Sequence, residues 1–411
     1  MHHLFLNFIV RSLALVVAFL SIADAQVAPV SPQPFSQTGF STLAAYGQNG
    51  TTGGGDLAPV SVRTAKEFQT ACERLDIKDK RVRGQTPRVV LVANDLDLGE
   101  LKNVTGNSTG KNVGIVRVQS HTTIYSTSGA TIRRGTLELH GSCNVIIANL
   151  KFRDLWEFDP TEKYDALGWD YVRITDKDEM RAHHVWVDHC DFGKVYDGAL
   201  DIVHGSDCVT VSWCKFSGDE RGPQKKVTLI GHSSGAGGAK LDRGYLNVTL
   251  HHNWYQNIED RAPRARFGNI HSFNNLIEGA QYATISVMSA VTLVEHNVYR
   301  DVKCATSFSH AKDSLAKEKG GTLCIVSSLN ETPRTASRAV KESESMEQAN
   351  NFKSNVERGS LKFNAPAVLK WENLNALPYA YGAGPVDATT ELVKRWAGAG
   401  RVEYLATGFR F

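Results

Sequence analysis

Short segments in which apolar and polar residues alternate recur along the chain, and this pattern is typical of half-buried strands. Successive segments begin 40, 24, 39, 22 and 22 residues apart, which indicates a basic unit in the low twenties with two insertions. Most of the segments end in Phe or Tyr. They read VIIANLKF (145–152), VWVDHCDF (185–192), VTVSWCKF (209–216), VTLHHNWY (248–255), IHSFNNLI (270–277) and TLVEHNVY (292–299).

This spacing predicts an all-β fold, a right-handed parallel β-helix in which one single-domain solenoid stacks turn upon turn. The sixth position of the segments reads Leu150, Cys190, Cys214, Asn253, Asn275 and Asn297. Asparagines at one place in successive turns are expected to form a ladder of side-chain hydrogen bonds. A β-sandwich is the alternative, but it does not favour a fixed period, a recurring Asn and a shared terminal aromatic residue together.

The two ends of the repeat differ from its middle, as the caps of a solenoid must. Thr64 and Glu67 form a capping box that predicts an N-terminal capping helix. Its apolar face is expected to contain Phe68, Ala71, Cys72 and Leu75. A short packing helix is expected over residues 391–399, and residues 309–360 are expected to form a peripheral surface excursion.

Alternation within three segments also predicts which side chains face solvent. The inward set is Val185, Val187, Leu200, Ile202, Val227 and Leu229. The outward set is Trp186, Asp188, Asp197, Ala199, Asp201, Lys226 and Thr228.

Three outward carboxylates, Asp188, Asp197 and Asp201, lie within fourteen positions of one another. Crowded carboxylates repel unless protons or a cation neutralise them, and oxygen ligands on a rigid frame suit Ca²⁺. A solvated acidic edge is the alternative from spacing alone. Nearby cations favour the calcium interpretation, because calcium and cationic side chains together would bind a polymer of carboxylates.

Those cations include Lys226 and the segment RAPRAR (261–266), which contains three arginines. Two other motifs are absent from the sequence: there is no HExxH and no phosphate-binding GxxxxGK[ST]. The histidine pairs 183–184 and 251–252 are therefore interpreted as packing or hydrogen-bonding residues. Cys190 and Cys214 hold the ladder position and are expected to be buried.

Charge is nearly balanced, with 46 basic and 43 acidic residues and a net charge of +3. This balance indicates neither a nucleic-acid partner nor a membrane surface. Arg11 precedes an apolar run over residues 13–22, and Ala23-Asp24-Ala25-Gln26 supplies a small-residue cleavage pattern. Residues 1–25 are therefore predicted to be a secretory signal peptide and residues 26–411 the mature, extracellular domain.

Seven cysteines suit an oxidising compartment. Cys304 and Cys324 flank a Gly-Gly turn and are the first choice for a disulfide, and Cys72 with Cys143 or Cys208 is a weaker one. Glycosylation sequons occur at Asn49, Asn103, Asn107, Asn247 and Asn330, and none of them is assigned as modified.

Residues 130–305 resemble the pectate lyase family of polysaccharide lyases. The resemblance rests on VWVDHCDF, DGALDIVHGSDCVTVSWCKF, KVTLIGHSS and LNVTLHHNWYQNIEDRAPRARFGNIHSFNN, taken in that order. It implies a parallel β-helix that cleaves polygalacturonate by Ca²⁺-dependent β-elimination. By motif it implies Asp188, Asp197 and Asp201 as calcium ligands, Lys226 and Arg266 as substrate contacts, and Arg261 as the catalytic base. Arg264 is left as structural or peripheral, and a secreted monomer is expected.

Other functions stay open at this point. A pectin lyase acts on methyl-esterified polymer and needs no calcium, so the acidic trio favours pectate instead. A polygalacturonase hydrolyses with paired carboxylates and water, and the arginine motif argues against it. A non-catalytic β-helix that binds cell walls would not need a base. The charge of Arg261 is itself a difficulty, because a guanidinium has a pKa above about 12; without the resemblance it would be interpreted as an anion stabiliser.

Overall fold

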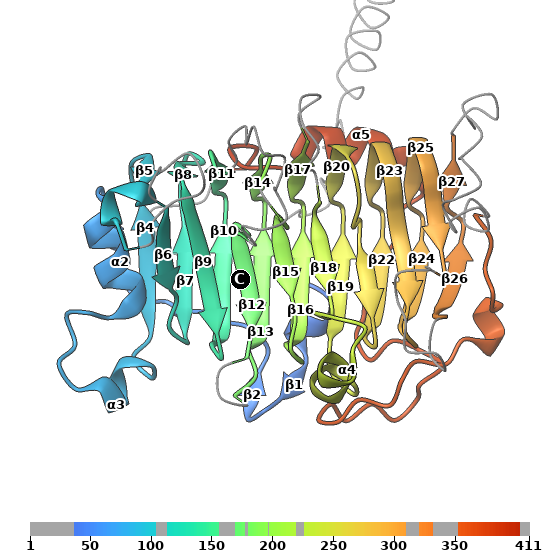
Figure 1. Cartoon of the computed structure of the whole chain (residues 1–411), viewed down its shortest axis with the longest axis horizontal. Helices are drawn as coiled ribbons and strands as arrows, with labels where there is room; N and C mark the ends of the chain where they lie inside the picture. Colours follow the sequence, from blue (N-terminus) through green and yellow to red (C-terminus); the bar gives the residue numbers. More distant parts are fainter. Residues whose placement is uncertain are drawn as a thin grey trace, which may run out of the picture. The chain divides into compact units, whose positions relative to one another are not determined.

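The computed structural model describes residues 37–103, 113–155, 169–176, 180–195, 197–218, 226–309, 320–331 and 352–402. The predicted signal peptide, the sequon at Asn107 and most of the expected surface excursion lie outside these ranges. Most described strands pair in parallel, and they stack as the coil of a right-handed β-helix (Figure 1). The all-β fold predicted from the repeat is confirmed.

One of the two parallel sheets has ten strands among the described residues. They are β3 (Val60–Val62), β4 (Arg88–Val92), β7 (Thr122–Tyr125), β10 (Cys143–Ala148), β13 (His183–Asp188), β16 (Asp207–Ser212), β19 (Asn247–His251), β22 (Asn269–Phe273), β24 (Val291–Glu295) and β26 (Thr322–Val326).

The second sheet is folded into two arms that meet at one long strand, β23 (Leu276–Val287). The aromatic arm comprises β5 (Leu96–Asp97), β8 (Thr131–Arg133), β11 (Lys151–Arg153), β14 (Asp191–Phe192), β17 (Lys215–Ser217) and β20 (Trp254–Ile258). The carboxylate arm comprises β6 (Gly114–Arg117), β9 (Gly135–His140), β12 (Val172–Thr175), β15 (Leu200–Ile202), β18 (Thr228–Ile230) and β21 (Arg264–Arg266). β25 (Val298–Ser307) pairs with β23 and with β27 (Leu329–Asn330).

The chain visits the three faces in turn, which explains the period of the sequence. From β13 it passes to β14 in the aromatic arm, then to β15 in the carboxylate arm, and returns to the ten-stranded sheet as β16. The same circuit recurs along the coil. Each circuit therefore places chemically similar residues above one another in register.

Two interior stacks hold successive turns together. Phe152, Phe192, Phe216 and Tyr255 stack face to face, with ring centroids 4.9, 4.9 and 5.0 Å apart. The predicted asparagine ladder is also present. Asn275 Oδ1 accepts hydrogen bonds from the backbone N–H of Asn253 at 2.9 Å and from its Nδ2 at 3.0 Å. In the next turn, Asn297 Oδ1 accepts the corresponding two hydrogen bonds from Asn275.

Strand register corrects one expected orientation. β15 pairs with β18 so that Leu200 is opposite Thr228 and Asp201 is opposite Leu229. Leu200 belongs to the hydrophobic core, so Thr228 shares its inward direction and Leu229 shares the outward direction of Asp201. The expectation that Leu229 faces inward and Thr228 outward is wrong, because the strand begins one residue later than its apolar pattern indicates.

The N-terminal cap forms as predicted. In α2 (Ala65–Glu73), Thr64 Oγ1 accepts a hydrogen bond from the Glu67 N–H at 3.2 Å, and Glu67 Oε2 accepts one from the Thr64 N–H at 3.1 Å. Phe68, Ala71 and Cys72 are buried. Leu75 follows the end of the helix and is 38% exposed, so its expected place on the packed face is wrong.

The outer face of the ten-stranded sheet is covered by the C-terminal part of the chain. Trp396 and Val402 pack against a cluster that includes Tyr125, Ile146 and Trp186. The predicted C-terminal helix is present as α5, with bounds Val386–Trp396. The remaining short elements are β1 (Ala44–Ala45), β2 (Gln48–Asn49), α3 (Lys80–Arg83), α4 (Ala236–Asp242), η1 (Phe40–Thr42), η2 (Leu98–Leu101) and η5 (Arg358–Ser360). None of the described helices has the length and hydropathy needed to span a membrane.

None of the seven cysteines forms a disulfide in the structure. Cys304 lies on β25 and Cys324 on β26, which belong to different sheets, so the expected disulfide between them is not formed. The weaker pairing of Cys72 with Cys143 or Cys208 is not formed either. The sequon at Asn247 lies in the interior, because this residue is fully buried and its Nδ2 donates to Asp207 at 2.7 Å.

Candidate active site

Two carboxylates converge over a glycine on the carboxylate arm. Gly198 donates its N–H to Asp170 Oδ1 at 2.7 Å. A Cβ atom at Gly198 would lie 2.2 Å from Asp201 Oδ1 and 2.9 Å from Asp170 Oδ1. The glycine therefore leaves the space that both carboxylates share. Asp201 Oδ1 is buried and has no hydrogen-bond partner.

A third carboxylate brings basic side chains to this cluster. Asp197 Oδ1 lies 3.3 Å from Arg261 Nη1 and 4.0 Å from Lys226 Nζ. Arg261 Nη1 also lies 3.9 Å from Asp201 Oδ1. The structure thus brings together four of the residues that the sequence singled out, from segments about sixty residues apart.

Arg261 is held by its own backbone and by Asp260. Its N–H donates to Asp260 Oδ1 at 2.7 Å, and its carbonyl accepts from the Thr228 N–H at 2.7 Å. The other carboxylate oxygen of Asp260 accepts from Arg264 Nη2 at 2.5 Å. Arg264 is therefore a structural partner within this segment, in agreement with its sequence interpretation.

Arg266 also belongs to the carboxylate arm, where it is the last residue of β21. Its Nη1 donates to the Gly231 carbonyl at 3.0 Å. Its charge also acts on the neighbouring His232, whose pKa is lowered first by burial and then by His204, Arg173 and Arg266. Arg266 therefore lies beside Gly231 and His232, next to the end of β18.

Asp188 is not part of this cluster, and the prediction that it joins Asp197 and Asp201 is wrong. It lies on β13 in the ten-stranded sheet and is fully buried. Its carboxylate accepts hydrogen bonds from Ser212 Oγ at 2.5 Å and from His189 Nδ1 at 2.6 Å. Alternation correctly predicted that Asp188 points out of its sheet, but that sheet is a different face of the coil.

Asp170 takes the position that the sequence analysis gave to Asp188. A signal for it was available: GWDYVRI (168–174) and GALDI (198–202) each lead into a strand, and pairing Val172 with Leu200 places Asp170 beside Gly198. Strand alternation does not identify Asp170, because this residue precedes β12 and the alternating pattern begins only within the strand.

Burial and mutual repulsion act strongly on these carboxyl groups. The pKa of Asp170 is raised well above its ordinary value by burial first and then by the charges of Asp201 and Asp197. Burial likewise raises the pKa of Asp201 to about 6, even though Arg261 acts to lower it. For Arg261, burial lowers the pKa, but Asp201 and Asp197 outweigh burial, so the net pKa lies above the ordinary value.

The donor set fits a hard cation. Three carboxylates offer oxygen atoms only, and one buried oxygen of Asp201 lacks a hydrogen-bond partner. In the present arrangement Arg261 neutralises Asp197, and no group of three or more His, Cys, Asp or Glu among the described residues is gathered closely enough to hold a metal. A cation would therefore compete with the guanidinium for Asp197 and Asp201.

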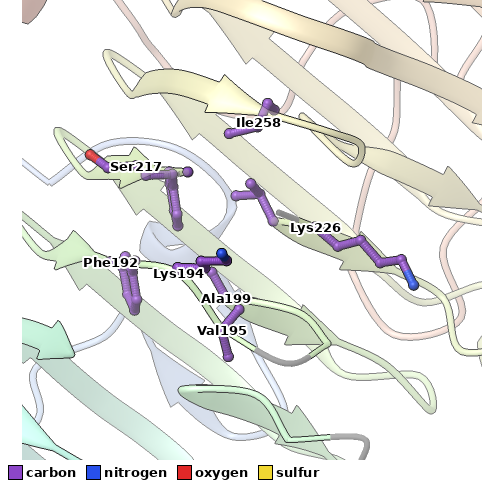
Figure 2. A pocket seen from close by; sticks show the side chains of 11 residues that line it. Phe192, Lys194, Val195, Ala199, Ser217, Lys226 and Ile258 are labelled. Carbon is purple, nitrogen blue, oxygen red and sulfur yellow. The ribbon is translucent and has the colours of Figure 1, made fainter. Parts of the chain in front are cut away.

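A small apolar pocket lies next to the cluster but does not contain the carboxylates. Its lining includes Phe192, Val195, Ala199, Phe216 and Ile258. In Figure 2 the side chain of Lys226 extends away from these residues, so its ammonium group lies outside the apolar lining. Lys226 belongs to the lining of this pocket, whereas Asp170, Asp197 and Asp201 do not.

The family model described as pectate lyase matches residues 25–401. The chain belongs to the pectate lyase family. It is therefore a polysaccharide lyase by family. Pectate lyase B of Paenibacillus amylolyticus is 31% identical over 331 residues, which cover 66% of this chain and 80% of that protein.

Other pectate lyases match in sequence and in fold. The pectate trisaccharide-lyase of Thermotoga maritima is 34% identical over 270 residues, which cover 65% of this chain and 63% of that protein. A solved pectate lyase from Paenibacillus sp. 0602 superposes with a TM-score of 0.66 at 23% identity, covering 91% of this chain and 98% of that one. A pectate lyase from Bacillus sp. N165, solved with trigalacturonate, gives a TM-score of 0.62 at 17% identity over 89% and 99% of the two chains.

Proposed function

We propose that this chain is a secreted, calcium-dependent pectate lyase, active as a monomer, that cleaves α-1,4-linked polygalacturonate by β-elimination and leaves 4,5-unsaturated ends. The observation that carries the proposal is the adjacency of Arg261 to Asp197 and Asp201, with Asp170 and Lys226 beside them. Family membership supports the reaction class. The trigalacturonate bound by the relative from Bacillus sp. N165 supports the substrate class.

The proposed calcium ligands are Asp170, Asp197 and Asp201. Asp170 replaces Asp188 in this set, because only Asp170 shares the space over Gly198 with Asp201. When bound, Ca²⁺ supplies positive charge that neutralises these carboxylates and that of the substrate and makes the adjacent C–H bond more acidic. Lys226 and Arg266 flank the cluster and would bind substrate carboxylates, which fixes the register of the polymer.

Arg261 is the proposed base. In a galacturonate unit the C5 hydrogen is α to the C6 carboxylate. Removal of that proton by Arg261 leaves an electron pair that forms the C4–C5 double bond, and the C4–O bond to the next sugar breaks. The departing oxygen takes a proton from solvent. Asp197 and Asp201 raise the pKa of Arg261 in the present arrangement, so the base role requires that other cations engage these carboxylates.

A spectroscopic assay tests the proposal. Purified protein is mixed with polygalacturonate, and the absorbance of the unsaturated product is followed with added Ca²⁺ and with EDTA. We expect absorbance to rise with Ca²⁺ and to stop with EDTA. A rise on methyl-esterified pectin despite EDTA would instead indicate a pectin lyase. New reducing ends without absorbance would indicate hydrolysis, and no product at all would leave a binding protein.

A further inference from the structure

Arg173 lies directly beside the carboxylate cluster but has no role so far. It is on β12, and the register pairs it with Asp201 of β15 on one side and with Glu138 of β9 on the other. Arg117 of β6 continues this row. Because paired residues of parallel strands share a direction, Arg173 points outward on the same face as Asp201.

Arg173 differs from the other arginines of this face in lacking an acceptor among the described residues. Arg117 Nε lies 3.3 Å from Glu138, Arg261 pairs with Asp197, and Arg264 pairs with Asp260. By contrast, Arg173 Nε is buried with no hydrogen-bond partner. No ion pair joins its guanidinium to a described acidic residue, although Asp201 is its neighbour in the sheet.

A partly buried guanidinium without an acceptor is costly, because its N–H groups have lost water and gained nothing in return. Its neighbours include carboxylates, whose repulsion of an anion the proposed Ca²⁺ would offset. The charge of Arg173 acts on Asp170, Asp201, His204 and His232, so the group lies within electrostatic range of the carboxylates and of the two histidines. The ring centroids of His204 and His232 are 4.5 Å apart. A planar carboxylate would supply the acceptor that Arg173 lacks.

We propose that Arg173 is a further substrate-binding residue, whose guanidinium binds the carboxylate of a uronate unit next to the one that reacts. The inference rests on the proposed function and extends it to one more sugar unit. Arg173 lies one strand from Asp201 on the β9 side, whereas Lys226 and Arg261 lie on the β18 side. Neighbouring strands are about 4.8 Å apart, so the two groups of cations would contact different units of the polymer.

The test compares Arg173→Gln and Arg173→Lys with Arg117→Gln. The control, Arg117→Gln, also removes one arginine charge from this face of the carboxylate arm. The guanidinium of Arg117 already forms an ion pair with Glu138, and its side chain is 65% exposed. Initial rates on polygalacturonate at saturating Ca²⁺ give KM and kcat, and the Ca²⁺ concentration for half-maximal rate is measured separately. Calorimetry with trigalacturonate and Ca²⁺, in an Arg261→Lys background that prevents turnover, gives Kd directly.

We expect Arg173→Gln to raise KM and Kd about 10-fold, as for a lost charge-assisted hydrogen bond, with kcat within about twofold. Arg173→Lys should fall between wild type and Arg173→Gln, since it keeps the charge but loses the planar fork. Thermal unfolding midpoints should match that of wild type, because no described partner is lost.

Three results would overturn the inference. One is an unchanged KM and Kd in Arg173→Gln. A second is a change confined to the Ca²⁺ requirement, which would make Arg173 only an electrostatic neighbour of the carboxylates. The third is an equal effect of Arg117→Gln. If wild type forms no unsaturated product, the proposed function fails, and the calorimetric Kd still decides whether Arg173 binds a uronate.

Discussion

Arg261 Nη1 lies 3.3 Å from Asp197 Oδ1, although the two residues belong to segments separated by several strands. The contact forms because β15 and β21 lie on one arm with only β18 between them. Arg261 therefore compensates the repulsion among Asp170, Asp197 and Asp201. Arg261 is also the proposed base, and substitution can separate this proposed role from its compensation of the carboxylates.

Replacing Arg261 with Lys should abolish most activity without unfolding the protein. Lysine keeps a positive charge near Asp197, so the carboxylates remain compensated. Loss of the proposed base should lower kcat/KM by at least about 100-fold on polygalacturonate. The control is Arg133→Lys, which alters an exposed pair with Asp154 and should leave the rate within about twofold. A variant that keeps more than about a tenth of wild-type kcat/KM would remove Arg261 from the base role.

Asp170→Asn and Asp188→Asn should distinguish the proposed calcium ligand Asp170 from Asp188 on the ten-stranded sheet. Loss of a direct ligand should raise the Ca²⁺ concentration for half-maximal rate by about 10-fold or more in Asp170→Asn. Asp188→Asn should leave the Ca²⁺ requirement unchanged but lower the free energy of unfolding by about 1–3 kcal/mol, because Ser212 and His189 lose their charged acceptor. The reverse pattern would restore the original assignment of Asp188.

Asn275→Ala should destabilise the coil from within. Asn275 Oδ1 accepts from the N–H and the side chain of Asn253, and its Nδ2 donates to the Leu250 carbonyl at 2.9 Å. These groups are buried and cannot be rehydrated, so the free energy of unfolding should fall by about 3 kcal/mol. Urea unfolding measures the change, with the exposed Asn375→Ala as the control. Equal stability of the two variants would show that the ladder contributes nothing.

Acid should weaken the fold through histidines that are neutral when folded. Burial, followed by His184 and His121, lowers the pKa of His183 to about 3, and burial lowers the pKa of His251 well below its ordinary value of 6.5. The unfolded chain binds protons below about pH 6.5 while the folded chain does not, so stability is present above that pH and is lost as pH falls toward 3.

The slope contributed by each such group is at most about 1.4 kcal/mol per pH unit. Urea midpoints measured from pH 7 to pH 4 should therefore decline, and His183→Gln should make the decline shallower than in wild type. The variant His140→Gln, at an exposed position, is the control and should not change the slope. A pH-independent midpoint in wild type would contradict the neutral state of the buried histidines.

Reducing agents should leave the stability unchanged. None of the seven cysteines forms a disulfide in the structure. Titration of the protein denatured without reductant should therefore count seven reactive thiols, and dithiothreitol should not shift the thermal midpoint. A count of five, with a midpoint lowered by reductant, would show that one pair such as Cys304 and Cys324 is joined after all.

Much of the fold could be predicted because it is a local property repeated many times. Each turn must bury its own apolar strand faces and satisfy its own polar groups. The period, the aromatic stack from Phe152 to Tyr255 and the asparagine ladder are therefore all visible when the repeats of the sequence are aligned with one another. Alternation predicts that the charged residues Asp197, Asp201 and Lys226 face outward, whereas Arg261 is indicated by the arginine-rich segment 261–266 and by the family resemblance.

The sequence by itself determined the repeating β architecture, the N-terminal cap and most members of the charged cluster, because alternation and capping depend on a few adjacent residues. Only the tertiary structure decided which of the three faces each outward residue occupies. Alternation distinguishes inside from outside, yet it carries no information about the corner angle between one strand and the next. That angle separates Asp188 from Asp201, brings Asp170 beside Gly198, and leaves Arg173 on the same face as the carboxylates.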